Sequence, residues 1–125
     1  MYFGGNQFTV RQSGAKILRA LSSVGVNLIM FDHRGYGEST GTPSVENLRQ
    51  DAIDNYDFAR KLIQGKLIVH GQSLGSFEAG AVASVRSLDG LVLESSATNV
   101  EEWANVLVPW YARLFVRLNI SSELK

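Results

Sequence analysis

The stretch from Leu67 to Ser76 constrains the fold of this chain more than any other part of its sequence. Leu67 to Val69 is a short apolar run with branched side chains, as a buried strand of a parallel sheet requires. Gly71 and Gly75 flank a serine, and their missing side chains allow a turn too tight for other residues. The small residues after Ser76 suit a helix packed closely on a sheet. The stretch therefore predicts a strand, a sharp turn and a helix.

The turn itself, Gly71-Gln72-Ser73-Leu74-Gly75, has the Gly-x-Ser-x-Gly pattern of a nucleophile elbow. Such a turn holds its serine in a strained conformation at the tip of the strand, facing the positive end of the following helix. The pattern alone is weak evidence, because glycine-flanked serines also occur in ordinary strand-to-helix turns. With a strand before it and a helix after it, we expect Ser73 to be a nucleophile and the Leu74 N–H to be an oxyanion donor.

The rest of the chain alternates between strands and helices. Its apolar patterns predict strands over residues 1–3, 26–31, 67–69 and 91–93, and helices over residues 13–24, 45–63, 76–87 and 100–118. Because the connections are short and the elements alternate, we expect an α/β fold: a three-layer sandwich with a mostly parallel sheet. We expect Gly25 to cap the first helix at its C-terminus and Ser44 to cap the second at its N-terminus. The apolar stripe predicted for the first helix consists of Ile17, Leu18, Leu21 and Val24.

Three marked loops follow strands of this predicted sheet: Gly4-Gly5-Asn6, Asp32 to Ser39, and Gly71 to Gly75. Ligands of open parallel sheets bind at the carboxyl ends of the strands, where these loops should converge. We expect the backbone N–H of Asn6 to be the second oxyanion donor, with Gly5 as the alternative, and Gly5 and Gln72 to contact substrate. The other interpretation of Gly4-Gly5-Asn6 is an ordinary glycine turn.

The residues of the loop from Asp32 to Ser39 indicate a structural role for it. Asp32 and Arg34 can fix it through charge-assisted hydrogen bonds, and Gly35 and Gly37 allow it to turn. We expect it to form a wall of the site.

With these segments the chain resembles the central part of an α/β-hydrolase, in the serine-hydrolase branch of esterases, thioesterases and serine aminopeptidase-like proteins. The residues that carry the resemblance are Tyr2-Phe3-Gly4-Gly5-Asn6, Asp32-His33-Arg34-Gly35-Tyr36-Gly37-Glu38-Ser39, His70-Gly71-Gln72-Ser73-Leu74-Gly75 and Leu91-Val92-Leu93-Glu94-Ser95. The resemblance implies cleavage of an ester, thioester or amide, without a cofactor or metal. It also implies that residues 1–125 are a single partial domain that lacks the first strands and the C-terminal strands carrying the acid and the histidine. Many members have His-Gly in the first loop, where this chain has Gly4-Gly5.

A catalytic base is missing from this pattern. A triad in this branch runs in the order serine, acid, histidine, but the only histidines, His33 and His70, precede Ser73. Each is an alternative base, and each is more simply a packed structural histidine. Glu94 is the candidate acid after the turn. Asp89 is expected in a turn before the last strand, and Glu78 is expected to be a solvated or salt-bridged helix residue.

An alternative hypothesis follows from the missing histidine: a truncated, non-catalytic binding or assembly module. It predicts exposed sheet edges and self-association. A third hypothesis has a partner chain supplying the acid and base. The aromatic residues of the last predicted helix are interpreted either as an acyl pocket or, more simply, as core; they are Trp103, Trp110, Tyr111 and Phe115.

The composition narrows the classes of binding partner that the chain is expected to have. The formal net charge is +0, so nothing indicates a nucleic acid or an anionic membrane. No apolar run is long enough to span a bilayer. There is no cysteine, which excludes disulfides and thiol chemistry and leaves the compartment open, with the cytoplasm as the default expectation.

Overall fold

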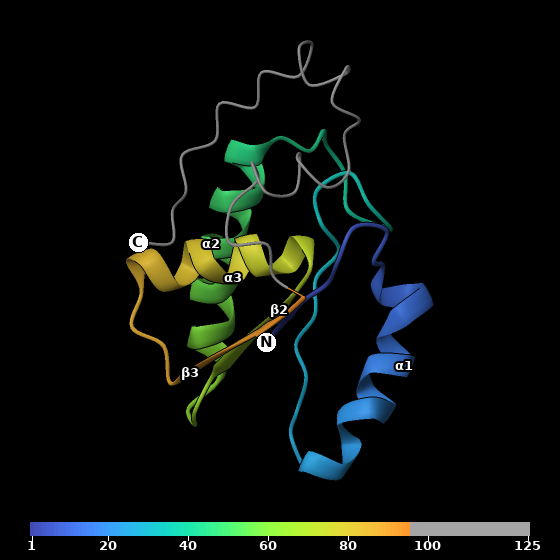
Figure 1. The fold of residues 1–125 in the computed structure, drawn as a ribbon. Helices are drawn as coiled ribbons and strands as arrows, with labels where there is room; N and C mark the ends of the chain where they lie inside the picture. The colour runs from blue at the N-terminus through green and yellow to red at the C-terminus, as the bar shows by residue number, and fades with distance from the viewer. Residues whose placement is uncertain (96–125) are drawn as a thin grey trace.

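The computed structural model describes residues 1–95 of the chain, which combine strands and helices in an α/β arrangement (Figure 1). The elements in chain order are β1 (Tyr2–Phe3), α1 (Val10–Leu21), the 3₁₀ helix η1 (Ser22–Val24), α2 (Val45–Leu62), β2 (Ile68–Gln72), α3 (Leu74–Val85) and β3 (Gly90–Glu94). The helix predicted over residues 100–118, with its aromatic residues, lies outside the described part.

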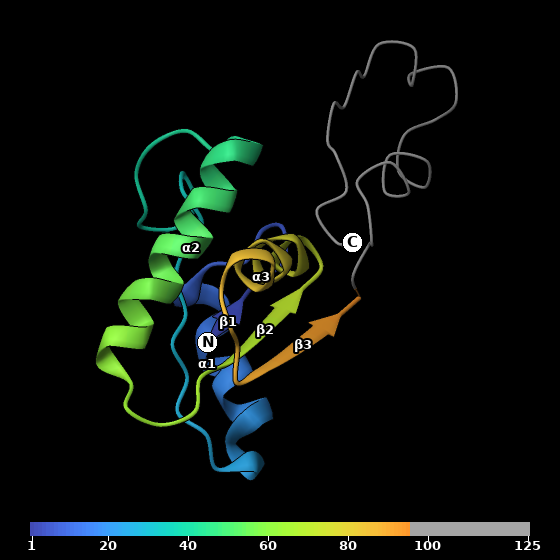
Figure 2. The same cartoon turned by 90° about the vertical axis from the view of Figure 1, so that its left-hand side faces the viewer.

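The three strands form one parallel sheet in the order β1-β2-β3 (Figure 2). His70 in β2 lies opposite Tyr2 in β1 and Val92 in β3. The strand predicted over residues 26–31 is wrong as a regular element: a single parallel bridge joins Met30 to Tyr2, and the Tyr2 N–H donates to the Ile29 carbonyl at 2.9 Å. Because β1 spans only two residues, it cannot form a longer hydrogen-bonded ladder with this segment. The segment still runs beside β1 in the predicted direction.

One face of the sheet carries the core. Phe3 and Val69 pack there against α2 and α3, with Ala52, Tyr56, Ala79 and Val82 among the buried partners. Successive strand residues point to opposite faces, so Tyr2 and Met30 face the other side. There Gly14 of α1 packs on Met30, whose methyl carbon would lie 3.4 Å from a side-chain carbon at Gly14. Helices therefore lie on both faces of the parallel sheet, as an α/β-hydrolase core requires.

Local signals set most helix ends. The Ser44 hydroxyl accepts from the Asn47 N–H at 3.1 Å, and Gly25 adopts the left-handed conformation at φ 69°, as predicted. Helix α1 begins at Val10, three residues before its predicted start, because Thr9 caps it and Asp32 accepts the Val10 N–H. Helix α3 begins at Leu74, two residues earlier than predicted.

The stripe predicted for α1 is wrong in part. Leu18 is 50% exposed and Val24 is 66% exposed, whereas Ile17 and Leu21 are half-buried. The buried contact of α1 is instead made by Gly14, which has no side chain to show in an apolar pattern. At the edge of the sheet opposite β1, the strand β3 leaves Leu91, Val92 and Leu93 exposed. None of the helices in residues 1–95 is long and apolar enough to cross a membrane.

Candidate functional site

Ser73 occupies the turn between β2 and α3 with an unusual backbone conformation. Its φ is 52° and its ψ is −116°, a backbone region that residues other than glycine rarely adopt. The Ser73 N–H donates to the Glu94 carbonyl at 2.9 Å, and the Ser73 carbonyl accepts the Ser76 N–H at 2.9 Å. The turn is therefore fixed from both sides, by β3 and by the first turn of α3.

The two glycines of the motif are required by close backbone contacts. A side-chain carbon at Gly71 would lie 2.3 Å from the Gly75 carbonyl oxygen, and one at Gly75 would lie 2.1 Å from the Phe3 carbonyl oxygen. Real carbons essentially never approach this closely. Gly75 thus lets the start of α3 press directly against the end of β1, which brings the first loop to Ser73.

The loop Gly4-Gly5-Asn6 lies against Ser73. A side-chain carbon at Gly5 would be 3.4 Å from Ser73 Cβ and 3.8 Å from Ser73 Oγ. The Phe8 N–H donates to the Gly5 carbonyl at 3.0 Å, closing a turn in which Gln7 has a φ of 72°. The Tyr36 hydroxyl donates to Asn6 Oδ1 at 3.1 Å, so the second loop touches the first. The predicted convergence of the three loops at the carboxyl ends of the strands is confirmed.

The loop from Asp32 to Ser39 is held by its charged residues. The Asp32 carboxylate accepts the Val10 N–H at 2.7 Å and the Glu38 N–H at 3.0 Å. Arg34 pairs with Asp51 through two hydrogen bonds, of 2.8 and 2.5 Å. Gly35 and Gly37 have φ values of 76° and 53°. These contacts confirm the structural role predicted for Asp32 and Arg34.

His33 and Glu78 form a buried pair, so of the two states expected for Glu78 the salt-bridged one is found and the solvated one is not. They are 5% and 3% exposed, and His33 Nδ1 lies 3.1 Å from each carboxylate oxygen. His33 Nε2 lies 3.0 Å from the Gly4 carbonyl oxygen. Burial lowers the pKa of His33, but the hydrogen bond and charge of Glu78, together with the backbone hydrogen bonds of Gly4 and Gly5, outweigh it and raise that pKa. Burial raises the pKa of Glu78.

The sequence contains a signal for this buried pair, although the expectation of a solvated or salt-bridged Glu78 did not use it. Glu78 stands inside a run of small and apolar residues on a helix that is buried almost all round. A carboxylate in such a place needs a polar partner, because an unpaired buried charge is very costly.

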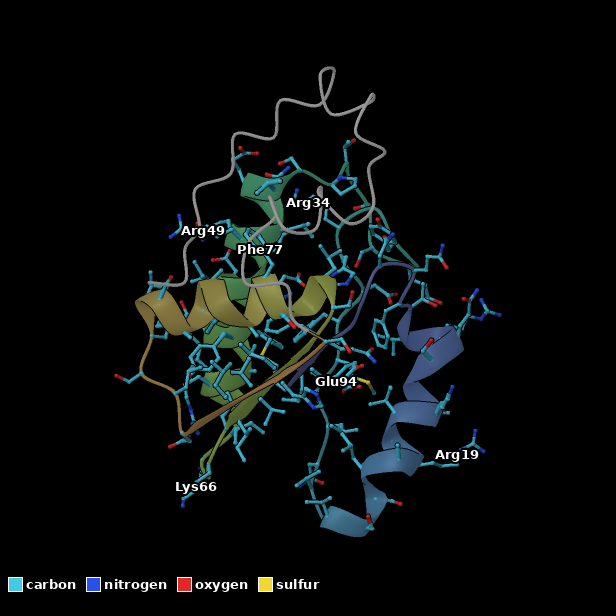
Figure 3. All side chains as sticks on the ribbon, viewed as in Figure 1. Arg19, Arg34, Arg49, Lys66, Phe77 and Glu94 are labelled. Atoms are coloured by element: carbon cyan, nitrogen blue, oxygen red, sulfur yellow. The ribbon has the colours of Figure 1, made fainter. Side chains whose placement is uncertain are left out.

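A second polar network joins the strand ends. The Tyr2 hydroxyl donates to Gln72 Oε1 at 2.7 Å, and Gln72 Nε2 donates to Glu94 Oε1 at 3.3 Å. His70 Nε2 lies 3.2 Å from Glu94 Oε2. Figure 3 shows Glu94 at the end of the sheet where the loops meet, and Lys66 at the opposite end. Asp89 lies in the turn before β3, where it pairs with Arg60 and accepts the Leu67 N–H.

Neither histidine serves Ser73 in this arrangement. Within residues 1–95, both ring nitrogens of His33 and the Nε2 of His70 are directed to other partners. Within the described part of the chain, no three metal-ligating side chains come together. In this part of the chain the site thus has a strained serine and a glycine loop beside it, with no base in hydrogen-bonding contact.

Comparison with known proteins places this chain in a family. Residues 11–125 match the family described as serine aminopeptidase, S33. The chain is 37% identical over 97 residues to the lysophosphatidylserine lipase ABHD12 of Danio rerio, across 71% of this chain and 25% of that protein. It is 35% identical over 97 residues to the Bos taurus lipase of the same name, with 71% and 24% covered. It is 36% identical over 99 residues to the uncharacterized protein YfhR of Salmonella typhi, with 67% and 34% covered. The chain spans about a quarter of the length of these lipases.

Proposed function

The chain belongs to the serine aminopeptidase (S33) family of α/β-hydrolases, and from this premise we propose that it is part of a serine hydrolase with Ser73 as its nucleophile. One observation carries the proposal: Ser73 has a strained backbone with a positive φ at the tip of β2, and the Gly5 position lies beside its Oγ. Strain of this kind persists only where surrounding contacts impose it, and it concentrates at functional sites.

In the proposed reaction, Ser73 Oγ attacks the acyl carbon of the substrate and loses its proton to a base. The carbonyl oxygen becomes an oxyanion, which the N–H groups of Leu74 and Asn6 stabilise, with Gly5 as the alternative to Asn6. The leaving group departs with a proton, and water then releases the acyl group from Ser73. Leu74 is the first residue of α3, so its N–H belongs to the unpaired donors at a helix start. Gly5 and Gln72 are proposed to contact the substrate.

The base and acid are proposed to come from outside this chain. Its only histidines are His33 and His70, and no histidine follows Ser73. Residues 1–125 would then be one partial domain of the complete gene product. Glu94 is a second candidate for the acid, because its carboxylate lies at the strand end next to Ser73 and already contacts Gln72.

The substrate class is an ester, thioester or amide. Among these we favour a carboxylic ester, because similar relatives are named lysophosphatidylserine lipases. A small-molecule ester would reach Ser73 from the side where the three loops meet.

Hydrolysis of p-nitrophenyl esters by the complete gene product tests this proposal. We expect turnover by the wild type and its loss in Ser73→Ala. Ser84→Ala is the matched control, since that hydroxyl donates to the Ala81 carbonyl at the far end of α3, and it should keep wild-type turnover. Equal turnover in Ser73→Ala and wild type would reject Ser73 as the nucleophile.

A non-catalytic binding or assembly module is the second candidate. Two features favour it: the missing histidine and the exposed apolar residues of β3, where Leu91 and Val92 are 40% and 46% exposed. It predicts self-association of the chain through the sheet edge. Sedimentation of the chain as a monomer at micromolar concentration would count against it, and a partner histidine found near Ser73 would instead favour a shared site.

A further inference from the structure

The His33–Glu78 pair joins α3 to the glycine loop and has no role in the reaction proposed above. Both side chains are almost fully buried, and burying two ionisable groups costs several kcal/mol unless good hydrogen bonds compensate. Their contacts are specific: Glu78 holds one ring nitrogen of His33, and the Gly4 carbonyl holds the other.

The position of one proton follows from these contacts. The Gly4 carbonyl oxygen can only accept, so His33 Nε2 must carry a proton and donate it at 3.0 Å. Nδ1 faces the Glu78 carboxylate, and a second proton there can lie on either group. In both cases the Nε2–H bond to Gly4 is kept, because Glu78 fixes the ring orientation and the tautomer.

This bond fixes the direction of the N–H groups in the loop. None of the peptide bonds in residues 1–95 is cis, so each carbonyl points opposite to the N–H of the next residue. His33 holds the Gly4 carbonyl, which sets the Gly5 N–H, and the Phe8 N–H holds the Gly5 carbonyl, which sets the Asn6 N–H. Two consecutive glycines would otherwise leave this loop free to rotate.

We propose that His33, oriented by Glu78, is a positioning residue that holds the Gly4-Gly5-Asn6 loop so that its N–H groups meet the oxyanion formed at Ser73. The inference rests on the proposed hydrolase function. Oxyanion donors act only when they are preorganised, and a displacement of about 1 Å costs about a hundredfold in rate. The donors contact charge that exists only in the transition state, so their loss lowers kcat and leaves KM nearly unchanged.

Four variants of the complete gene product test the inference by ester hydrolysis. His33→Phe keeps a ring but loses both polar atoms, whereas His33→Gln keeps an N–H donor for Gly4. We expect His33→Phe to lower kcat by about 10- to 100-fold with KM within about twofold, and His33→Gln to recover most of that loss. Glu78→Gln should keep most activity because its amide can still hold Nδ1, and Glu78→Met should resemble His33→Phe.

Tyr56→Phe is the control for a general loss of stability. It removes a buried hydroxyl that donates to the Ser87 carbonyl at 3.1 Å, away from the loop, and should leave kcat unchanged. Amide hydrogen exchange of Gly5 and Asn6 gives a readout that needs no activity. We expect exchange to quicken by about tenfold or more in His33→Phe and not in Tyr56→Phe.

The outcomes separate the two proposals. Wild-type exchange rates or wild-type kcat in His33→Phe would overturn the positioning role, as would a raised KM with kcat unchanged. A wild type that hydrolyses no ester would overturn the proposed function and the catalytic meaning of the pair, even if exchange at Gly5 quickens.

Discussion

Replacing Gly75 by alanine should disrupt the contact that brings α3 to the end of β1. The added carbon would lie 2.1 Å from the Phe3 carbonyl oxygen and 2.7 Å from the Gly4 carbonyl oxygen. A contact beyond 3.0 Å requires the backbones to separate by at least 0.9 Å. Neither side yields easily, because the Met1 carbonyl accepts the His70 N–H at 2.9 Å and thus ties the start of the chain to β2.

The expected cost lies at the upper end of that seen for overpacked cores, about 3 kcal/mol of unfolding free energy. For a domain of about 150 to 250 residues that corresponds to a fall in Tm of about 6 to 12 °C. Gly65→Ala is the matched control: nothing lies within 4 Å of its added carbon, so its Tm should stay within about 2 °C of wild type. Thermal and urea unfolding of the complete gene product measure both. A cost below about 1 kcal/mol for Gly75→Ala would refute the close approach of α3 to β1.

Two further predictions concern the loop and the buried pair. Gly5→Ala should fold with nearly wild-type stability, because its added carbon makes only ordinary contacts at 3.4 Å or more. The methyl group beside Ser73 Oγ should nevertheless lower ester turnover. Unchanged turnover would mean that the substrate binds elsewhere. The raised pKa of His33 means that its contribution to stability is fully present below its ordinary value of 6.5 and is lost as pH rises through the folded-state pKa. The raised pKa of Glu78 acts in the same direction. The Tm of wild type should therefore exceed that of the His33→Phe/Glu78→Met double variant by more at pH 6 than at pH 9. A Tm difference that is constant or grows with pH would contradict the raised pKa values of this pair.

The sheet and its loops could be predicted because their signals are local. Short apolar runs marked the three regular strands, Ser44 and Gly25 marked helix ends, and Gly71 and Gly75 marked the sharp turn. All of these depend on the residue itself and its immediate neighbours. The order of elements then placed the three loops at one edge of a parallel sheet.

What could not be predicted depends on contacts between distant residues. The segment 26–31 fails to form a regular strand because its neighbour β1 is only two residues long. Helix α1 packs through Gly14, which leaves part of its apolar stripe exposed. The His33–Glu78 pair joins residues 45 positions apart, so no local pattern connects the two.

Labelling with a fluorophosphonate tests the role of Ser73 most directly. Lys66 and Arg86 bound a tryptic peptide of residues 67–86 that contains Ser73, Ser76 and Ser84. Ser76 is buried and donates to the Gly71 carbonyl, so it is a built-in comparison within the same peptide. Fragmentation of this peptide from the labelled complete gene product should place one phosphonyl group on Ser73 and none in Ser73→Ala. A label on another serine, or a folded protein that takes up no label, would contradict the assignment of Ser73 as the nucleophile.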